Sequence, residues 1–164
     1  MLKGYVYLGL TVDTLHHGHI NLIKKGLKYG KIIIGLITDK AIAKNKRLPL
    51  LNYNQRKIII ENISGVSKIV EQTDWDYSIN LKKYKPEYMI HGDDWLYGPQ
   101  FSLRKKAINV LKNYGGKLIE IPHTKDISST ALADNQHALG ITPDIRLHSL
   151  RRNLEAKGFL RFIE

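Results

Sequence analysis

A continuous apolar segment, Lys31-Ile32-Ile33-Ile34-Gly35-Leu36-Ile37, limits the folds that are open to this chain. After its first residue it shows none of the alternation between apolar and polar residues that a strand with one wet face displays. Such a strand must be covered on both faces, which is typical of a parallel sheet between two layers of helices. The segment therefore predicts an α/β fold.

Strand-like and helix-like segments alternate along most of the chain. Apolar runs predict strands at 4–10, 31–37, 66–70, 88–91 and 117–121, and helical spacing predicts helices at 20–27, 53–63, 77–84 and 103–114. Strands that alternate with helices form parallel sheets with right-handed crossovers. We therefore predict a Rossmann-like doubly wound parallel five-stranded sheet with helices on both faces. Ligands of such sheets bind outside the carboxyl ends of the strands.

The character of the sequence changes after residue 135. Thr142 suits the N-cap of a helix and Pro143 its first position. We predict one domain at 1–135, followed by a linker and helical extension at 136–164. Because the chain ends on the apolar run Phe159–Ile163, we expect this extension to lead into a further domain.

Two imidazoles, His16 and His19, stand where the first predicted strand passes into the first predicted helix. Unpaired backbone N–H groups and the positive end of the helix dipole favour anions at such a junction. Gly18 is expected to leave room for a phosphate beside the backbone. A bound polyphosphate would also favour protonated imidazoles. The pattern H-x-G-H therefore predicts chemistry on a polyphosphate, with His17 as a spacer.

The charge of the chain raises a second interpretation. Its 26 Lys and Arg residues exceed its 15 Asp and Glu residues, for a net charge of +11, which is compatible with nucleic-acid binding. The basic residues are scattered in short runs, and no RNA-binding aromatic signature accompanies them. We therefore expect small anionic substrates and no nucleic acid.

Other features exclude several kinds of protein. The absence of cysteine excludes disulfides, Cys-ligated zinc and a thiol nucleophile. Neither a signal-peptide cleavage site nor an apolar run long enough to cross a bilayer occurs. We therefore expect a cytoplasmic protein that does not interact with membranes.

Taken together, the motifs resemble those of cytidylyltransferases in the H-x-G-H nucleotidyltransferase superfamily, above all the glycerol-3-phosphate cytidylyltransferases. The resemblance covers about residues 4–134, through Thr11–His19, Tyr53–Lys57, His91–Trp95 and Ile127–Thr130. It implies an enzyme that joins CMP from CTP to a phosphorylated alcohol and releases pyrophosphate, with Mg²⁺ assisting. Relatives are often dimers, so a homodimer is expected.

The resemblance also implies roles for individual residues. Three are expected to be catalytic, namely His16, His19 and the loop residue Lys46. Those expected to bind the nucleotide are Thr11, Val12, Asp13, Gly18, Arg56, Gly92, Asp93, Asp94, Trp95, Ile127, Ser128, Ser129 and Thr130. Asp13 is in addition the candidate metal ligand.

Several of these assignments have a plainer alternative. For Arg56 it is a salt bridge, for Trp95 core packing, and for residues 128–130 an ordinary helix cap. Lys44 competes with Lys46 for the phosphate contact, and either lysine would also suit a solvated loop. Where relatives usually have an arginine, this chain reads His123-Thr124-Lys125. His123 and Lys125 are expected to replace only part of the bidentate phosphate contact of that arginine.

The C-terminal segment carries a second resemblance. Residues 149–164 are similar to the segment that precedes the catalytic barrel of phosphoenolpyruvate mutases, which occur fused to cytidylyltransferases in phosphonate biosynthesis. This likeness implies a fused mutase domain and a phosphonate acceptor, 2-hydroxyethylphosphonate. Three alternatives remain open: a phosphorylated alcohol such as glycerol-3-phosphate as the acceptor, an adenylyltransferase of the same superfamily, and a nucleotide sensor without catalysis. The segment Gly92–Trp95 favours CTP over ATP.

Overall fold

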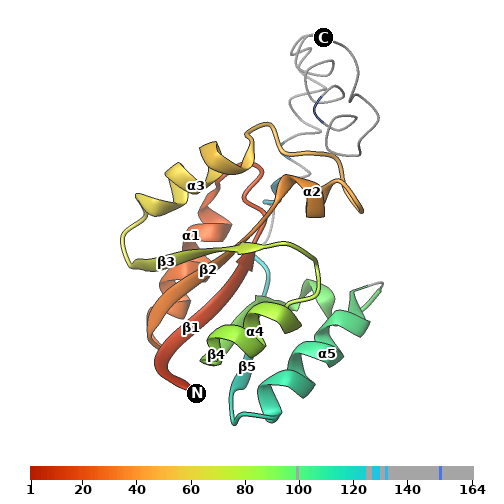
Figure 1. Ribbon diagram of the computed structural model, residues 1–164. Helices are drawn as coiled ribbons and strands as arrows, with labels where there is room; N and C mark the ends of the chain where they lie inside the picture. Colours follow the sequence, from red (N-terminus) through yellow and green to blue (C-terminus); the bar gives the residue numbers. More distant parts are fainter. Residues whose placement is uncertain (99, 125–126, 130–131, 133–151, 153–164) are drawn as a thin grey trace.

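The computed structural model describes residues 1–98, 100–124, 127–129, 132 and 152 of the 164-residue chain. The strands are β1 (Leu2–Leu10), β2 (Lys31–Ile37), β3 (Val66–Gln72), β4 (Pro86–Gly92) and β5 (Lys117–Ile121). The helices are α1 (His17–Gly26), α2 (Asp39–Ile42), α3 (Tyr53–Glu61), α4 (Ser78–Tyr84) and α5 (Phe101–Lys112), with a 3₁₀ turn η1 (Asp93–Trp95) after β4 (Figure 1). Among the described residues, no helix combines the length and apolar character of a membrane span.

Each predicted strand and helix within 1–121 is present, with ends that differ by a few residues. The short helix α2 was not predicted. Its N-cap is Thr38, whose hydroxyl accepts a hydrogen bond from the backbone N–H of Ala41 at 3.3 Å. The predicted extension at 136–164 lies outside the described residues, apart from Arg152.

The five strands form one parallel sheet in the order β3-β2-β1-β4-β5, which confirms the predicted architecture. The chain winds outward from β1 through β2 to β3, then returns to the other side of β1 for β4 and β5. The winding therefore reverses between β1 and β4. In open α/β sheets this switch point, at the carboxyl ends of the strands, is where a crevice forms.

The sheet is covered on both faces, and β1 contributes to both cores. Val6, Leu8 and Leu10 pack with residues of α1 and α3 on one face. Tyr7, whose side chain points the other way, packs with residues of α4 and α5. Figure 1 shows the sheet between these two layers of helices. The uninterrupted apolar sequence of β2 is explained in the same way, because all its residues after Lys31 are buried.

A buried polar cluster anchors the loop between β3 and α4. Gln72 accepts hydrogen bonds from the Tyr7 hydroxyl and from Nδ2 of Asn80. Its own Nε2 donates to the carbonyl oxygens of Asp74 and Asp76, at 2.6 and 3.1 Å. The loop that follows β3 is therefore held against the sheet, and it carries two aromatic residues to the carboxyl edge.

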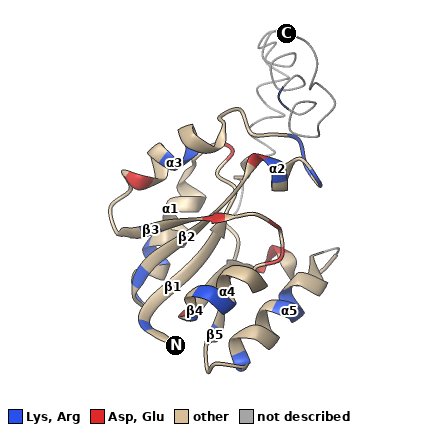
Figure 2. Cartoon of the chain, in the orientation of Figure 1, with Lys and Arg blue, Asp and Glu red and all other residues tan. Residues whose placement is uncertain are grey.

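The charged residues that the structure describes are spread over several helices and loops. Figure 2 shows Lys and Arg spread over both layers of helices and over the loops. Within the part of the chain that the structure describes, this view shows no continuous basic stripe of the kind that tracks a nucleic-acid backbone.

Candidate active site

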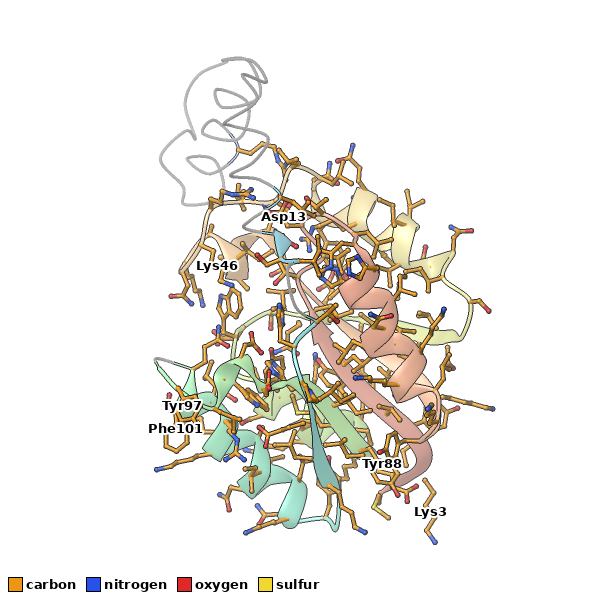
Figure 3. The ribbon with its side chains drawn as sticks, turned by 180° about the vertical axis from the view of Figure 1, so that it is seen from behind. Lys3, Asp13, Lys46, Tyr88, Tyr97 and Phe101 are labelled. Atoms are coloured by element: carbon orange, nitrogen blue, oxygen red, sulfur yellow. The ribbon has the colours of Figure 1, made fainter. Side chains whose placement is uncertain are left out.

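A cavity of about 540 Å³ opens at the carboxyl ends of the strands, at the switch point. Figure 3 shows Asp13 and Lys46 at this end of the sheet, with Lys3 and Tyr88 at the opposite end. Predicted site residues from five separate segments line the cavity: Thr11, Asp13, His16, Gly18, His19, Lys46, Gly92, Asp94, His123, Ser128 and Ser129. The topology thus brings together residues that lie more than 100 positions apart in the sequence.

The H-x-G-H segment forms the start of α1 with an unusual cap. Nδ1 of His16 accepts a hydrogen bond from the backbone N–H of Gly18 at 3.2 Å. Nδ1 of His19 accepts one in return from the backbone N–H of His16, at 3.4 Å. This is the geometry of a capping box, with imidazoles in place of the usual hydroxyl and carboxylate. Both imidazoles are consequently held in place at the cavity wall.

Burial keeps these imidazoles uncharged at neutral pH. It lowers the pKa of His19 to about 4, with a further contribution from the nearby imidazoles of His16 and His123. Burial also lowers the pKa of His16, with His17 and His123 acting in the same direction. In the protein without nucleotide, the helix start is therefore not a pair of cations.

Gly18 leaves room for the ring of His16, and its expected contact with phosphate stays a prediction. A Cβ atom at this position would lie 2.9 Å from Cε1 and Nδ1 of His16 and 3.4 Å from Cγ2 of Ile127. A side chain at this position would thus collide with the ring of His16, while Gly18 itself lines the cavity. Ile127 reaches the site through this packing and is not among the residues that line the cavity.

The loop after β5 closes against the same helix start. The hydroxyl of Ser129 donates to the carbonyl oxygen of Thr14 at 3.4 Å. The backbone N–H of His123 donates to Asp93 at 2.9 Å, and Nε2 of His123 donates to the carbonyl oxygen of Ile127 at 3.2 Å. Asp93 therefore supports the loop and does not line the cavity. The predicted residues Lys125 and Thr130 lie outside the described residues.

Asp13 is engaged by protein groups. Its Oδ2 lies 2.6 Å from Nη2 of Arg47, and its Oδ1 accepts the backbone N–H of Leu50 at 2.9 Å. The expected role of Asp13 as a metal ligand does not fit this geometry, because both carboxylate oxygens already have strong partners. The preceding residue, Val12, has a φ of 52° and a buried side chain in the core. A side-chain contact between Val12 and a nucleotide is therefore ruled out in this arrangement.

The basic loop after α2 directs one lysine into the cavity. The ammonium of Lys46 lies 5.1 Å from the ring centroid of Trp75, and both residues line the cavity. Lys44 instead forms an exposed ion pair with Asp74, at 3.1 Å, outside the cavity lining. Of the two candidate lysines, the structure therefore places only Lys46 where a phosphate could reach it.

Arg56 lies beneath the site, fully buried. Its guanidinium donates to the carbonyl oxygens of Thr11 and Ile37 and to the carboxylate of Asp39. The expected contact between Arg56 and phosphate does not fit, because the side chain has no exposed surface. Arg56 instead connects the carboxyl ends of β1 and β2 to the start of α2.

Trp95 is also a supporting residue. It is fully buried, and its Nε1 donates to Glu120 at 2.7 Å. The ring of His91 stacks on its indole, with centroids 3.7 Å apart and planes within 9°. Core packing, the plainer alternative, describes Trp95, while the neighbouring Asp94 lines the cavity with a side chain that is 57% exposed.

Sequence reasoning missed three aromatic residues that line the cavity, Trp75, Tyr77 and His91. Nε2 of His91 lies 3.2 Å from the Tyr77 hydroxyl, which donates because Nδ1 of His91 donates to the carbonyl oxygen of Gly92. Trp75 and Tyr77 lie in the loop between β3 and α4, and His91 is the penultimate residue of β4. Their places near the carboxyl ends of predicted strands could have identified them as site residues from the sequence.

Comparisons with known proteins show which family the chain matches. A sequence model of the family described as Cytidylyltransferase-like matches residues 7–135. A glycerol-3-phosphate cytidylyltransferase of Bacillus spizizenii is 28% identical over 131 residues, which cover 79% of this chain and 94% of that protein. An ethanolamine-phosphate cytidylyltransferase of Arabidopsis thaliana is 28% identical over 137 residues, which cover 76% of this chain and 30% of that protein.

One solved structure confirms the fold. The lipopolysaccharide core biosynthesis protein of Thermoplasma volcanium superposes with a TM-score of 0.63 at 21% identity, over 74% of this chain and 98% of that one.

Proposed function

The chain belongs to the cytidylyltransferase-like family, and from this premise we propose that it transfers CMP from CTP to a small phosphorylated alcohol and releases pyrophosphate. One observation carries the proposal: the helix start with His16 and His19 lines the same cavity as Ser128 and Ser129. A triphosphate that spans this cavity would have hydrogen-bond donors at both ends.

The proposed reaction requires no covalent intermediate. An oxygen of the acceptor's phosphate dianion attacks the α-phosphorus of CTP, and the bond from that phosphorus to the bridging oxygen of pyrophosphate breaks. Because the dianion is already a nucleophile, no general base is needed. Catalysis then consists of in-line positioning and of stabilising the charge on the transferred and leaving phosphates. We assign this stabilisation to His16, His19 and Lys46.

The described residues fit poorly with a metal ion held by the protein itself. They contain no cluster of three His, Asp or Glu side chains with metal-binding geometry. The carboxylate of Asp13 is paired with Arg47. Mg²⁺ commonly binds through substrate phosphates and keeps several waters. We therefore propose that Mg²⁺ enters the site as the Mg²⁺ complex of CTP.

The acceptor we propose first is a phosphorylated alcohol, since the relatives described above are named for glycerol-3-phosphate and ethanolamine phosphate. A phosphonate such as 2-hydroxyethylphosphonate presents the same three-oxygen group and is the second candidate. Its support is the resemblance of residues 149–164 to the segment before a mutase barrel. The fused mutase domain and the homodimer stay predictions.

Pyrophosphate release by the full chain tests the proposal. The chain is incubated with Mg²⁺, with CTP or ATP, and with glycerol-3-phosphate, phosphoethanolamine or 2-hydroxyethylphosphonate. We expect release with CTP that depends on at least one acceptor. Preference for ATP would identify an adenylyltransferase. Binding of CTP without release from any acceptor would identify a sensor, and either result overturns the proposal.

A further inference from the structure

The cavity has few places where a positively charged ligand could bind. Among its described lining residues, the carboxylates are Asp13 and Asp94. The side chain of Asp13 is only 11% exposed and is paired with Arg47 at 2.6 Å. Arg47 is itself held by a hydrogen bond from Nη1 to the carbonyl oxygen of Leu48, at 3.0 Å. The guanidinium of Arg47 is thus already paired with Asp13, the more buried of the two carboxylates.

The remaining carboxylate is a weak alternative. The side chain of Asp94 is 57% exposed, and one of its oxygens lies 3.5 Å from Nδ1 of His91. An ammonium paired with a carboxylate this exposed stays largely in water, where an ion pair stabilises little.

Of the aromatic rings in the cavity, the tryptophan, which suits a cation best, already has one. Proteins bind ammonium groups over the face of a tryptophan, within about 6 Å of the ring centroid. In this cavity the ring of Trp75 already has such a cation, the ammonium of Lys46, at 5.1 Å. Nε1 of Trp75 is bound to the carbonyl oxygen of Ala41 at 2.9 Å, so the ring is also held in place.

From these two occupied positions we infer that Arg47 and Lys46 select against acceptors that carry an amine cation. The acceptor is a hydroxyalkyl phosphate or phosphonate, without a positive charge of its own. This inference rests on the proposed cytidylyl transfer and names the acceptor class for the same site.

The positive charges in the cavity attract the anionic end of the acceptor and repel an amine cation. A phosphate or phosphonate dianion is attracted by Arg47 and Lys46. The ammonium of an aminoalkyl acceptor would approach the same two cations, or would have to displace one of them from Asp13 or Trp75. Specificity of this kind arises from repulsion of the wrong partner as much as from attraction of the right one.

Matched acceptors test the inference in the full chain. The two acceptors 2-hydroxyethylphosphonate and 2-aminoethylphosphonate differ only in a hydroxyl in place of the amine, and so do 2-hydroxyethyl phosphate and phosphoethanolamine. Pyrophosphate release with CTP gives kcat/KM for each. We expect the hydroxyl member of a pair to be preferred by about tenfold or more, which corresponds to one unfavourable charge contact.

Substitutions at Arg47 then identify the cause. Arg47→Gln frees the carboxylate of Asp13 and is expected to shift the preference toward the amine by about tenfold. Arg47→Lys keeps the charge and is expected to keep the preference. Asp13→Asn removes the carboxylate and gives the amine no partner, so no gain with the amine is expected. Thermal unfolding of each variant verifies that it is folded.

The outcomes separate this inference from the proposed function. Equal activity of the wild-type chain with both members of a pair overturns the inference and leaves cytidylyl transfer intact, whatever the stability of the variants. An unchanged preference in folded Arg47→Gln also overturns it. No pyrophosphate release with any acceptor overturns the proposed function.

Discussion

The imidazole rings of His16 and His19 lie 4.0 Å apart between centroids, and each accepts a backbone N–H of the helix start through its Nδ1 atom. A ring nitrogen that accepts a hydrogen bond carries no proton, so the proton of each neutral ring is on Nε2. The cap therefore prepares two uncharged Nε2–H donors for phosphate. Protonated imidazoles, which the sequence led us to expect, would have to give up these cap bonds.

Replacing His19 by alanine should abolish most of the turnover. The change removes one Nε2–H donor and one half of the cap, and loss of a preorganised donor typically lowers kcat by about 10²–10³. Steady-state pyrophosphate release with CTP measures the effect. His17→Ala is the matched control, because His17 is exposed and does not line the cavity. Normal turnover in His19→Ala would exclude the mechanism.

The free energy of unfolding should fall as the pH falls below about 6.5. The pKa of His19 is about 4 in the folded protein, whereas in the unfolded chain the imidazole is solvated and has its ordinary pKa of 6.5. Between these two pH values only the unfolded state binds the proton. This linkage removes about 2 kcal/mol between pH 7 and pH 5. Burial lowers the pKa of His16 and His91 as well, which adds in the same direction.

Denaturant unfolding at several pH values measures this dependence. His19→Gln, which cannot titrate in this range, should unfold with a smaller pH dependence than the wild type. An identical slope in both proteins would contradict the assignment to His19.

Replacing Arg56 by methionine should destabilise the fold strongly. The change removes the hydrogen bonds to Thr11, Ile37 and Asp39 and leaves buried acceptors without a donor. Breaking a buried ion pair in this way costs on the order of 3 kcal/mol. Lys57→Met is the control: Lys57 forms a half-exposed pair with Glu61 at 3.4 Å, and its loss should cost less than about 0.5 kcal/mol. Equal effects of the two changes would refute the structural role.

Trp95 and Asp94 should differ in what their replacement alters. Trp95→Phe keeps a ring beneath His91 but loses the bond to Glu120, so we expect a loss of stability of roughly 1–3 kcal/mol with little change in the KM for CTP. Asp94→Asn should change the KM and leave stability nearly unaltered, because Asp94 lines the cavity and is exposed. Unfolding curves measure the stability of both variants, and CTP titrations measure their KM. A changed KM with unaltered stability in Trp95→Phe would show that Trp95 contacts the nucleotide.

Arg152 should help to hold the loop that carries Lys46 and Arg47. Its Nη1 donates to the carbonyl oxygens of Pro49 and Leu50, at 2.9 and 2.7 Å. Arg152→Ala should make this loop more sensitive to limited proteolysis, while Arg152→Lys, which cannot make the same forked contacts, should give an intermediate result. Unchanged cleavage rates would show that these bonds do not restrain the loop.

The amino-acid sequence by itself determined the architecture and the place of the site. The apolar run at 31–37 requires two covered faces, and alternation with helical patterns requires parallel strands, because both properties follow from the local periodicity of side chains. The H-x-G-H segment similarly marks a helix start, since capping involves only neighbouring residues. That His16 and Ser129 meet at one crevice then follows from the winding of the sheet.

Only the tertiary structure decided which predicted residues reach the cavity. Arg56 and Trp95 were assigned to the nucleotide by their position in a motif, but both are buried on partners 45 and 25 residues away, Thr11 and Glu120. Asp13 does reach the cavity, where Arg47 and the backbone of Leu50 hold its carboxylate. The same holds for Lys46, whose position over Trp75 separates it from Lys44. A polar side chain binds whichever complementary group the folded chain brings within about 3 Å, and contacts between distant segments leave no periodic signal in the sequence.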